Sequence, residues 1–335
     1  MSPIPPDFDP DVLAAYLDRK FGTAGFTLAR IAGGQSNPTY LVTHGALRMV
    51  LRKQPVGEIL RGAHAIDREF RVMRALAETD VPVPKPILFE EDPAILGTPF
   101  YLMSFIEGRV FHDCRLPDLS PEDRRTAYES MAETLARLHR VKPEAIGLQD
   151  FGRPGNYFRR QLHRWSSQLE VSTFSVDPAL PRLAERLVVD LPEDDGLSVI
   201  AHGDFRLGNM MFHPETLQVV AVLDWELATI GHPLADLGFC CMPWVTSPDE
   251  YGGILGHESP GIPSQEAFIA RYRTMLPDVP VPTPFHIAFA LFRFAVIFVG
   301  IADRAAQGNA ADPRAMQYGP LSARFTRRAW QLLGE

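Results

Sequence analysis

Two acidic residues and one asparagine have the types and the spacing that phosphate chemistry requires. Asp204 follows His202 and Gly203, Asn209 comes five residues after Asp204, and Asp224 follows an apolar run 20 residues after Asp204. Phosphoryl transfer needs one carboxylate that orients the attacking hydroxyl and accepts its proton, and oxygen ligands that hold Mg²⁺ against the phosphates. We therefore interpret Asp204 as a catalytic base, and Asn209 and Asp224 as magnesium ligands.

A simpler reading of the same residues is a loop in which the Asp and the Asn only cap turns, and for a lone Asp-x-x-x-x-Asn that reading is the better one. Here His202 and Gly203 precede the Asp, and the apolar run 219–223 can return as the second strand of a hairpin before Asp224. This combination favours the chemical interpretation, with His202 in a supporting role.

The elements that must position these residues change character along the chain. The first third alternates short apolar strands with turns, and its two helical stretches have apolar residues at helical spacing. In this part we predict helices over residues 10–21 and 64–78, and strands over 27–31, 39–43, 48–52, 87–89 and 100–106.

The remainder is mainly helical, with one strand-rich interruption over residues 199–223. Helical patterns cover residues 121–139, 156–170, 178–190, 264–275, 284–304 and 313–333, and Ser120 is a plausible cap for the first of them. Strands followed by helices, without regular alternation, predict an α+β fold. We expect a first domain over residues 1–103, a link over 104–108 and a helical domain over 109–335.

Composition excludes several classes of protein. With 46% hydrophobic and 22% charged residues the chain resembles ordinary soluble globular proteins, and its net charge of −8 argues against a nucleic-acid partner. Three cysteines, two of them adjacent, suit a reducing cytoplasm and not a disulfide framework. The most apolar run, residues 286–300, is about 15 residues long and contains Arg293, so we expect a buried helix and no membrane span.

The stretches His202-Gly203-Asp204, Asn209 and Leu223-Asp224-Trp225 resemble the aminoglycoside phosphotransferase and choline kinase-like family, which is related to protein kinases. The chain is more closely similar to the kinase-like N-terminal domain of acyl-CoA dehydrogenase family members 10 and 11. That similarity lies in residues 33–40, 50–53, 67–72, 151–158 and 231–237. The resemblance implies a bilobal protein-kinase-like fold, ATP, Mg²⁺ and a small hydroxylated acceptor. It leaves protein partners undefined.

The resemblance also implies a nucleotide site in the first domain. A turn between two strands would approach the phosphates with its backbone, and it matches neither the Rossmann nor the P-loop pattern. Its residues are Gly34, Gln35, Ser36 and Asn37. On the next strand Arg52 takes the position of the usual kinase lysine, with Glu69 as its ion-pair partner. Because side chains alternate along a strand, we expect Arg52 to face the cleft and Lys53 to face solvent.

Further roles follow from the resemblance alone. Adenine would bond to the Ser104 carbonyl and the Ile106 N–H, and Arg206 would balance charge on the transferred phosphoryl group as a catalytic residue. Asp236 would support the catalytic loop by accepting backbone N–H bonds. For Glu226, contact with a second metal and a plain surface turn are both open.

The acceptor is suggested by a basic stretch in the helical domain. Arg153, Arg159 and Arg160 would clamp an acidic acceptor, although a solvated basic stripe is the simpler reading of them. These arginines and the closer resemblance favour a kinase for a hydroxy acid or a hydroxyacyl thioester. Two alternatives stay open: an aminoglycoside- or choline-type kinase for a cationic acceptor, and a catalytically silent nucleotide-binding protein of the same fold.

Overall fold

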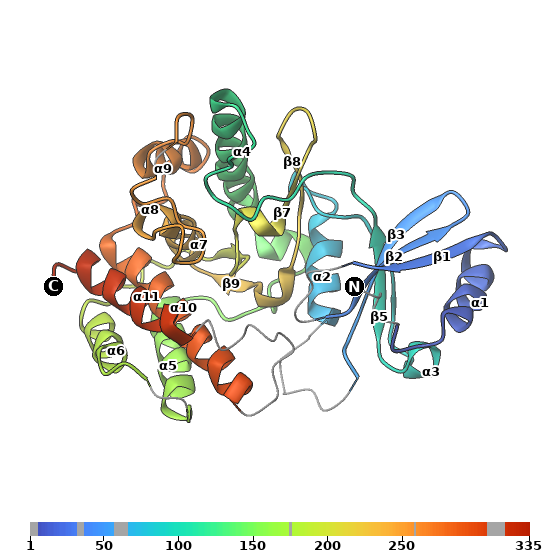
Figure 1. The fold of residues 1–335 in the computed structure, drawn as a ribbon, viewed down its shortest axis with the longest axis horizontal. Helices are drawn as coiled ribbons and strands as arrows, with labels where there is room; N and C mark the ends of the chain where they lie inside the picture. The colour runs from blue at the N-terminus through green and yellow to red at the C-terminus, as the bar shows by residue number, and fades with distance from the viewer. Residues whose placement is uncertain (1–5, 32–36, 57–65, 174–175, 258, 307–318) are drawn as a thin grey trace. The chain divides into compact units, whose positions relative to one another are not determined.

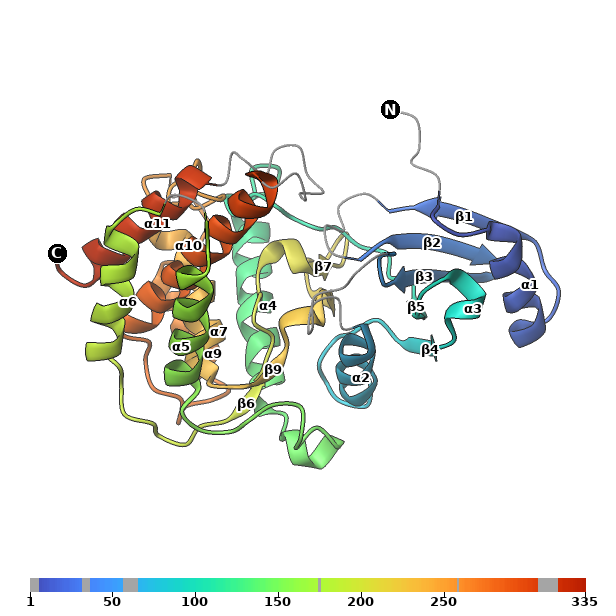
Figure 2. The same ribbon diagram turned by 90° about the horizontal axis from the view of Figure 1, so that it is seen from below.

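The structure is a computed structural model, and it describes residues 6–31, 37–56, 66–173, 176–257, 259–306 and 319–335. The chain divides into two compact units. One is Met1–Glu107 with Val220–Glu226, and the other is Gly108–Val219 with Leu227–Glu335. Figures 1 and 2 trace the elements of each. The sequence predicted that all of residues 109–335 form the second part. Val220–Glu226 departs from this, and its Val222 N–H donates to the Pro82 carbonyl of the first unit (2.8 Å).

The first unit is built on one antiparallel sheet with the strand order β1-β2-β3-β5-β4. Its strands are β1 (Phe26–Arg30), β2 (Thr39–His44), β3 (Leu47–Lys53), β4 (Pro86–Glu90) and β5 (Phe100–Ser104). Its helices are α1 (Pro10–Phe21), α2 (Ile66–Leu76) and α3 (Pro93–Leu96). The short connection between His44 and Leu47 makes β2 and β3 an antiparallel hairpin.

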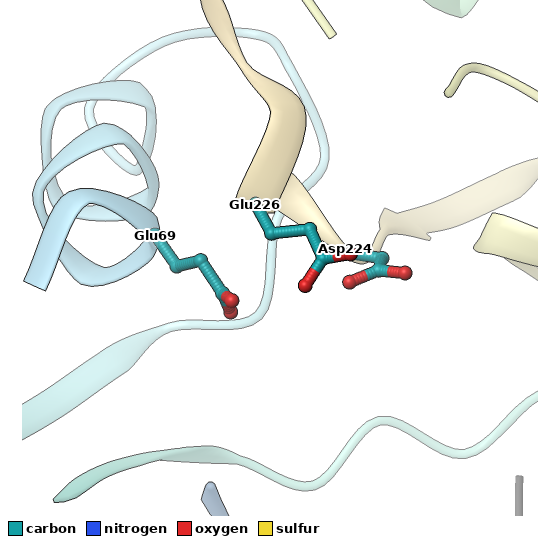
Figure 3. A group of neighbouring side chains, drawn as sticks. All are labelled: Glu69, Asp224 and Glu226. Carbon is teal, nitrogen blue, oxygen red and sulfur yellow. The ribbon is translucent and has the colours of Figure 1, made fainter. Parts of the chain in front are cut away.

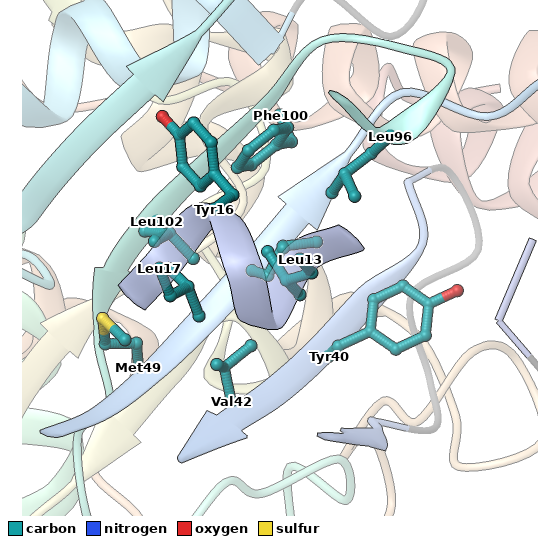
Figure 4. Packing of buried hydrophobic residues seen from close by; sticks show 10 residues of the cluster. Leu13, Tyr16, Leu17, Tyr40, Val42, Met49, Leu96, Phe100 and Leu102 are labelled. Atoms are coloured by element: carbon teal, nitrogen blue, oxygen red, sulfur yellow. The ribbon is translucent and has the colours of Figure 1, made fainter. Parts of the chain in front are cut away.

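Helix α1 covers one face of this sheet. Asp9 caps its start by accepting the Asp11 N–H (2.9 Å), and Gly22 ends it with φ 88°, a conformation that favours glycine. Leu13, Tyr16 and Leu17 are buried at helical spacing. Figure 4 shows them over the strands, in the core cluster of Leu13, Tyr16, Leu17, Tyr40, Val42, Met49, Leu51, Leu96, Phe100 and Leu102.

Strand alternation sorts the remaining side chains. Met49 and Leu51 of β3 belong to the core under α1, so Val50 and Arg52 point to the opposite face of the sheet. In β5, Tyr101 is paired with Arg52 and shares that face. The face opposite α1 therefore carries the side chains of Arg52 and Tyr101.

The second unit is mainly helical. Its helices are α4 (Pro121–Arg140), α5 (Tyr157–Glu170), α6 (Ala179–Val189), α7 (Pro233–Cys240), α8 (Met242–Val245), α9 (Gln265–Arg273), α10 (Pro284–Ala306) and α11 (Gly319–Leu332). Short strands and 3-10 turns lie between them: η1 (Pro143–Ile146), β6 (Val199–Ala201), η2 (Leu207–Asn209), β7 (Met210–Phe212), β8 (Val219–Val222), η3 (Trp225–Leu227) and β9 (Thr229–Gly231). Ser120 caps α4 by accepting the Asp123 N–H (3.1 Å), as predicted.

Helix α10 is the most apolar element, and α11 packs along it in both views (Figures 1 and 2). It is 23 residues long, which exceeds the apolar run seen in the sequence, and by length and composition it could cross a membrane. However, 83% of its most apolar window is buried inside the protein. The prediction of a buried helix is confirmed, and its phenylalanines are core residues.

The sequence patterns did not predict the short elements. Helices α3 and α8 have four residues each, and β9 has three, so none shows a full period of apolar residues. Helix α7 is buried on all sides and has no polar face to reveal it. Strand β5 ends at Ser104, two residues before its predicted end.

Candidate active site

The loop that carries Asp204 begins where β6 ends, and its shape depends on Gly203. This glycine has φ 83°, and a Cβ atom there would lie 2.8 Å from the Leu227 carbonyl oxygen. The loop needs glycine for both reasons. Asp236 of α7 accepts the N–H groups of His202 (2.7 Å) and Gly203 (2.8 Å), the contacts predicted for it.

The two oxygens of Asp204 differ in their surroundings. Oδ2 accepts from Asn209 Nδ2 (2.7 Å) and lies 3.2 Å from Arg206 Nε. Oδ1 is buried and has no hydrogen-bond partner among the described residues. A buried carboxylate oxygen without a donor is costly unless a ligand supplies one. The arrangement therefore fits a group that accepts a proton from a substrate.

Asn209 is held in place by its contacts with Asp204. Its amide nitrogen also donates to the Asp204 carbonyl (2.9 Å), and the residue is 6% exposed. Since the nitrogen is engaged twice, the amide oxygen is the atom that this side chain offers to a ligand. That is the orientation that metal binding by Asn209 requires.

Buried groups behind the loop hold Asp236 in place. His139 Nε2 lies 3.2 Å from Asp236 Oδ2, and His139 Nδ1 lies 2.8 Å from the Tyr272 hydroxyl. Burial alone would raise the pKa of Asp236, but the hydrogen bond and charge of His139 and the loop N–H groups lower it below its ordinary value. Arg293 of α10 donates to the Gly203 carbonyl. His139 is thus a buried histidine whose two ring nitrogens both have partners.

In the first unit, Glu69 is the centre of a buried polar cluster opposite α1. It accepts from the Tyr101 hydroxyl (2.9 Å) and from Asn37 Nδ2 (3.1 Å), and its Oε2 lies 3.2 Å from Arg52 Nε. Burial raises the pKa of Glu69 above its ordinary value. Arg52 opposes that shift and Asp224 adds to it. Arg52 and Glu69 therefore form the ion pair that the family pattern predicts.

Arg52 also joins Glu69 to Val220–Glu226, the return segment of the first unit. Its Nη2 lies 2.8 Å from Asp224 Oδ1 and 4.0 Å from Glu226 Oε2. Asp224 has φ 66°, a strained conformation for a residue with a side chain and one that recurs at functional sites. Burial alone would lower the pKa of Arg52, but Tyr101, Glu69 and Asp224 raise it above its ordinary value.

The donor set of this cluster suits a hard cation. Ligand oxygens of Glu69, Asp224 and Glu226 lie within 4.8 Å of one another, and Figure 3 shows the three carboxylates turned toward one space. Carboxylate oxygens are the ligands that Mg²⁺ prefers. The oxygens of Asp224 and Glu226 suit the magnesium role predicted for Asp224, whereas Glu69 is paired with Arg52, whose Nη2 also lies 2.8 Å from Asp224 Oδ1.

The prediction that Lys53 faces solvent is wrong. Lys53 is 0% exposed, and its Nζ lies 2.7 Å from Asp7 Oδ2 and 5.5 Å from the centre of the Phe8 ring. Alternation does place it opposite Arg52. The N-terminal segment covers that face, so the side chain is enclosed instead of hydrated. Sequence reasoning missed this because nothing links residue 7 to residue 53 locally.

The other predicted site residues are placed as follows. Gly34, Gln35 and Ser36 lie outside the described residues, and Asn37 binds Glu69. Ser104 is the last residue of β5, two residues before Ile106. Tyr101 was missed, although its place beside Arg52 follows once β3 and β5 are paired.

The three predicted acceptor arginines differ in their surroundings. Arg160 donates to the carbonyls of Arg153 and Pro154 and so holds the turn before α5. Arg153 and Arg159 are exposed.

A strand unit with a buried Arg–Glu pair, followed by a helical unit with a His-Gly-Asp loop, is the organisation of a kinase-like phosphotransferase. The chain belongs to the phosphotransferase enzyme family, whose model matches residues 27–268.

Two curated relatives cover nearly the whole chain. Acyl-CoA dehydrogenase family member 10 of Mus musculus is 39% identical over 329 residues, which are 96% of this chain and 31% of the relative. Acyl-CoA dehydrogenase family member 11 of Homo sapiens is 40% identical over 318 residues, or 90% of this chain and 40% of the relative. The chain thus spans 31% to 40% of the length of these proteins.

Solved structures agree on the fold. The crystal structure of a candidate aminoglycoside phosphotransferase from Ralstonia eutropha has a TM-score of 0.87 and 38% identity, and the match covers 97% of this chain and 98% of that one. An aminoglycoside phosphotransferase, APH(4)-Ia, in a ternary complex with ADP and hygromycin B has a TM-score of 0.61 at 13% identity, covering 94% and 98% of the two chains. At that identity the second match shows the fold alone.

Proposed function

We propose that this protein transfers the γ-phosphoryl group of ATP to the hydroxyl of a small molecule, with Mg²⁺ bound, and that the acceptor is a hydroxy acid or a hydroxyacyl thioester. The observation that carries the proposal is the state of Asp204. One oxygen is fixed by Asn209 and Arg206, and the other is buried without a partner among the described residues.

In the proposed reaction, Asp204 Oδ1 accepts the hydrogen of the acceptor hydroxyl. The hydroxyl oxygen forms a bond to the γ-phosphorus, the bond from that phosphorus to the bridging oxygen breaks, and ADP leaves with the electron pair. Arg206 stabilises the negative charge on the phosphoryl oxygens. General-base help of this kind is worth roughly 10²–10⁴-fold in rate.

The nucleotide would be held by the first unit. Arg52, organised by Glu69, supplies the positive charge for the α- and β-phosphates, and Asp224 with Asn209 would hold Mg²⁺. When bound, the metal neutralises charge on the phosphates. Support for ATP comes from APH(4)-Ia, which shares the fold and was solved with ADP.

The choice of acceptor rests on two observations. The relatives that match nearly the whole chain are named for acyl-CoA chemistry, which suits hydroxyacyl compounds. Arg153 and Arg159 are exposed, and they offer positive charge to an acidic group. A cationic acceptor of the aminoglycoside type would be served by unpaired carboxylates instead.

The test is turnover by the purified protein with Mg-ATP and a panel of acceptors: 3-hydroxybutanoate, 3-hydroxydecanoate, their coenzyme A thioesters, choline and kanamycin. We expect ADP release with the hydroxyacyl compounds. Asp204→Asn should lower kcat by about 10²–10⁴-fold while Mg-nucleotide binding is kept, and Asp118→Asn, an exposed acid in the same unit, should match the wild type. Turnover with choline or kanamycin alone would show that the acceptor is cationic and not a hydroxyacyl compound. Binding of Mg-ATP without any turnover would favour the catalytically silent alternative.

A further inference from the structure

A cavity in the second unit opens beside the proposed base. Its empty space, counted together with the open mouth, is about 620 Å³. Arg206 lines it and lies 3.2 Å from Asp204 Oδ2. Most of its wall is apolar, with Met131, Phe205, Leu207, Phe239, Met242 and Phe325.

Charge within the cavity wall is already compensated. Glu250, the acidic residue of the wall, accepts from Arg328 (2.9 Å) and from the Ser247 N–H (2.9 Å). A polycation entering here would find no carboxylate without a partner among the described lining residues. A hydrocarbon chain would find an apolar surface and would be freed from water.

Tyr251 lines this cavity together with Arg206. Its ring packs at 5.6 Å from Phe294 and 5.4 Å from Phe298, measured between ring centres, and the Arg206 guanidinium carbon lies 5.8 Å from the ring centre. A cation over an aromatic face is attracted to it. The same ring therefore forms part of the cavity wall and contacts the residue next to the base.

The backbone at Tyr251 is held in a strained conformation. Its φ is 69°, which an ordinary residue adopts only where its surroundings impose it. On either side the chain is fixed: Asp249 pairs with Arg324 (2.6 Å), and a Cβ atom on Gly253 would lie 1.9 Å from the Thr246 carbonyl oxygen. Strain of this kind is typical of residues whose placement serves function.

We propose that the cavity binds an aliphatic segment of the acceptor and that Tyr251 is its specificity-determining residue. The Tyr251 ring contacts the aliphatic segment of the acceptor and positions Arg206 for the phosphoryl group. The proposal rests on the proposed function for the direction of the acceptor, because the hydroxyl must reach Asp204. Binding of the chain itself does not depend on phosphoryl transfer.

Binding is tested first, without nucleotide. Calorimetry with butanoate, hexanoate, octanoate and decanoate should show affinity that rises up to about fourfold per methylene until the cavity is full. Met131→Phe, which narrows the cavity, should shift the preference to shorter acids. Equal affinity for all four acids, or a series unaffected by Met131→Phe, would overturn the proposal.

Turnover then tests Tyr251. The variant Tyr251→Gly removes the ring and suits the positive φ, so loss of folding does not obscure the result. The ratio of kcat/KM for 3-hydroxydecanoate over 3-hydroxybutanoate should fall about tenfold in Tyr251→Gly, and kcat should fall for both acids because Arg206 loses its support. Tyr251→Phe keeps the ring and should keep the ratio. A ratio unchanged in Tyr251→Gly would contradict the role. If neither acid is phosphorylated, the proposed function fails, and the carboxylate series still decides whether the cavity binds a chain.

Discussion

Arg52 and Lys53 are neighbours in sequence whose side chains serve opposite faces of one sheet. Arg52 reaches Glu69 and Asp224, whereas Lys53 is enclosed with Asp7 beneath the N-terminal segment. A shift of one residue along β3 would exchange these environments, so the register of the strand decides which cation serves the site.

We expect Arg52→Ala to raise the KM for ATP and to lower kcat, because the phosphates lose a positioned cation and Glu69 is left buried without its charge partner. Arg52→Lys should recover only part of the loss, since a point charge replaces a fork of donors. Steady-state kinetics with varied ATP measures both. Full recovery by Arg52→Lys would show that the fork geometry is not used.

We expect Lys53 to contribute to the stability of the fold and not to catalysis. Asp7→Asn should leave a buried ammonium with a weaker partner and lower the free energy of unfolding by about 1–3 kcal/mol, less than for a fully buried pair because Asp7 is 36% exposed. Adding Lys53→Met, which keeps the shape without the charge, should restore most of the loss. Urea unfolding measures it, with the exposed Glu91→Gln as control. A KM for ATP that changes in Asp7→Asn would give this pair a role in the site.

At the scale of elements, the N-terminus of α10 meets that of α7 through two histidines. His286 Nδ1 accepts the Thr283 N–H (3.0 Å), and His232 Nδ1 accepts the Leu234 N–H (3.2 Å), so both bonds require an unprotonated nitrogen. The rings are stacked 6.4 Å apart. Burial lowers the pKa of His232, and burial with the neighbouring His232 lowers the pKa of His286 to about 4.

A lowered pKa in the folded state means that the unfolded chain binds more protons between the two pKa values. The stability from neutral His286 is therefore complete above about pH 6.5 and is lost as pH falls toward about 4. Between pH 7.5 and 5 we expect the free energy of unfolding to drop by about 2 kcal/mol on account of this residue. In His286→Gln, which keeps an acceptor and does not titrate, urea unfolding should show a smaller drop. An equal drop in both proteins would assign the acid sensitivity to other groups.

At the scale of the whole molecule, the first unit is not one continuous stretch of chain. Val220–Glu226 supplies Asp224, which pairs with Arg52, and Val222, which bonds to Pro82. The unit is therefore completed only after about half of the second unit has been passed in sequence.

It follows that a fragment of residues 1–107 should be less ordered than the same residues in the full chain, because Arg52 loses a charge partner while only 13% exposed. Hydrogen exchange of β3 and α2 amides should be faster in the fragment. Adding a synthetic peptide of residues 218–228 should restore some protection, and a peptide with Asp224→Ala should restore less. Equal protection with and without the return segment would make it a passive connection.

Many of the helices, strands and motif residues of this protein can be predicted from its sequence, because the patterns that indicate them are local. Periodic apolar residues predicted α1, α4, α5 and α10, alternation predicted the central strands, and the spacing of Asp204, Asn209 and Asp224 pointed to phosphoryl transfer before any fold was known. The family assignment is confirmed for the same reason: its motifs are short and lie within single loops.

Other features depend on contacts between residues far apart in the chain, which no local pattern encodes. Burial of Lys53 requires residue 7, the Glu69 cluster requires Tyr101 from another strand, and the wall beside Arg206 combines α4, α7, α8 and α11 with Tyr251. In each case the role of a side chain depends on a partner that is distant in sequence, because burial, charge compensation and strain are properties of a packed environment. Local propensity set the elements, and tertiary packing decided which of their side chains share one site.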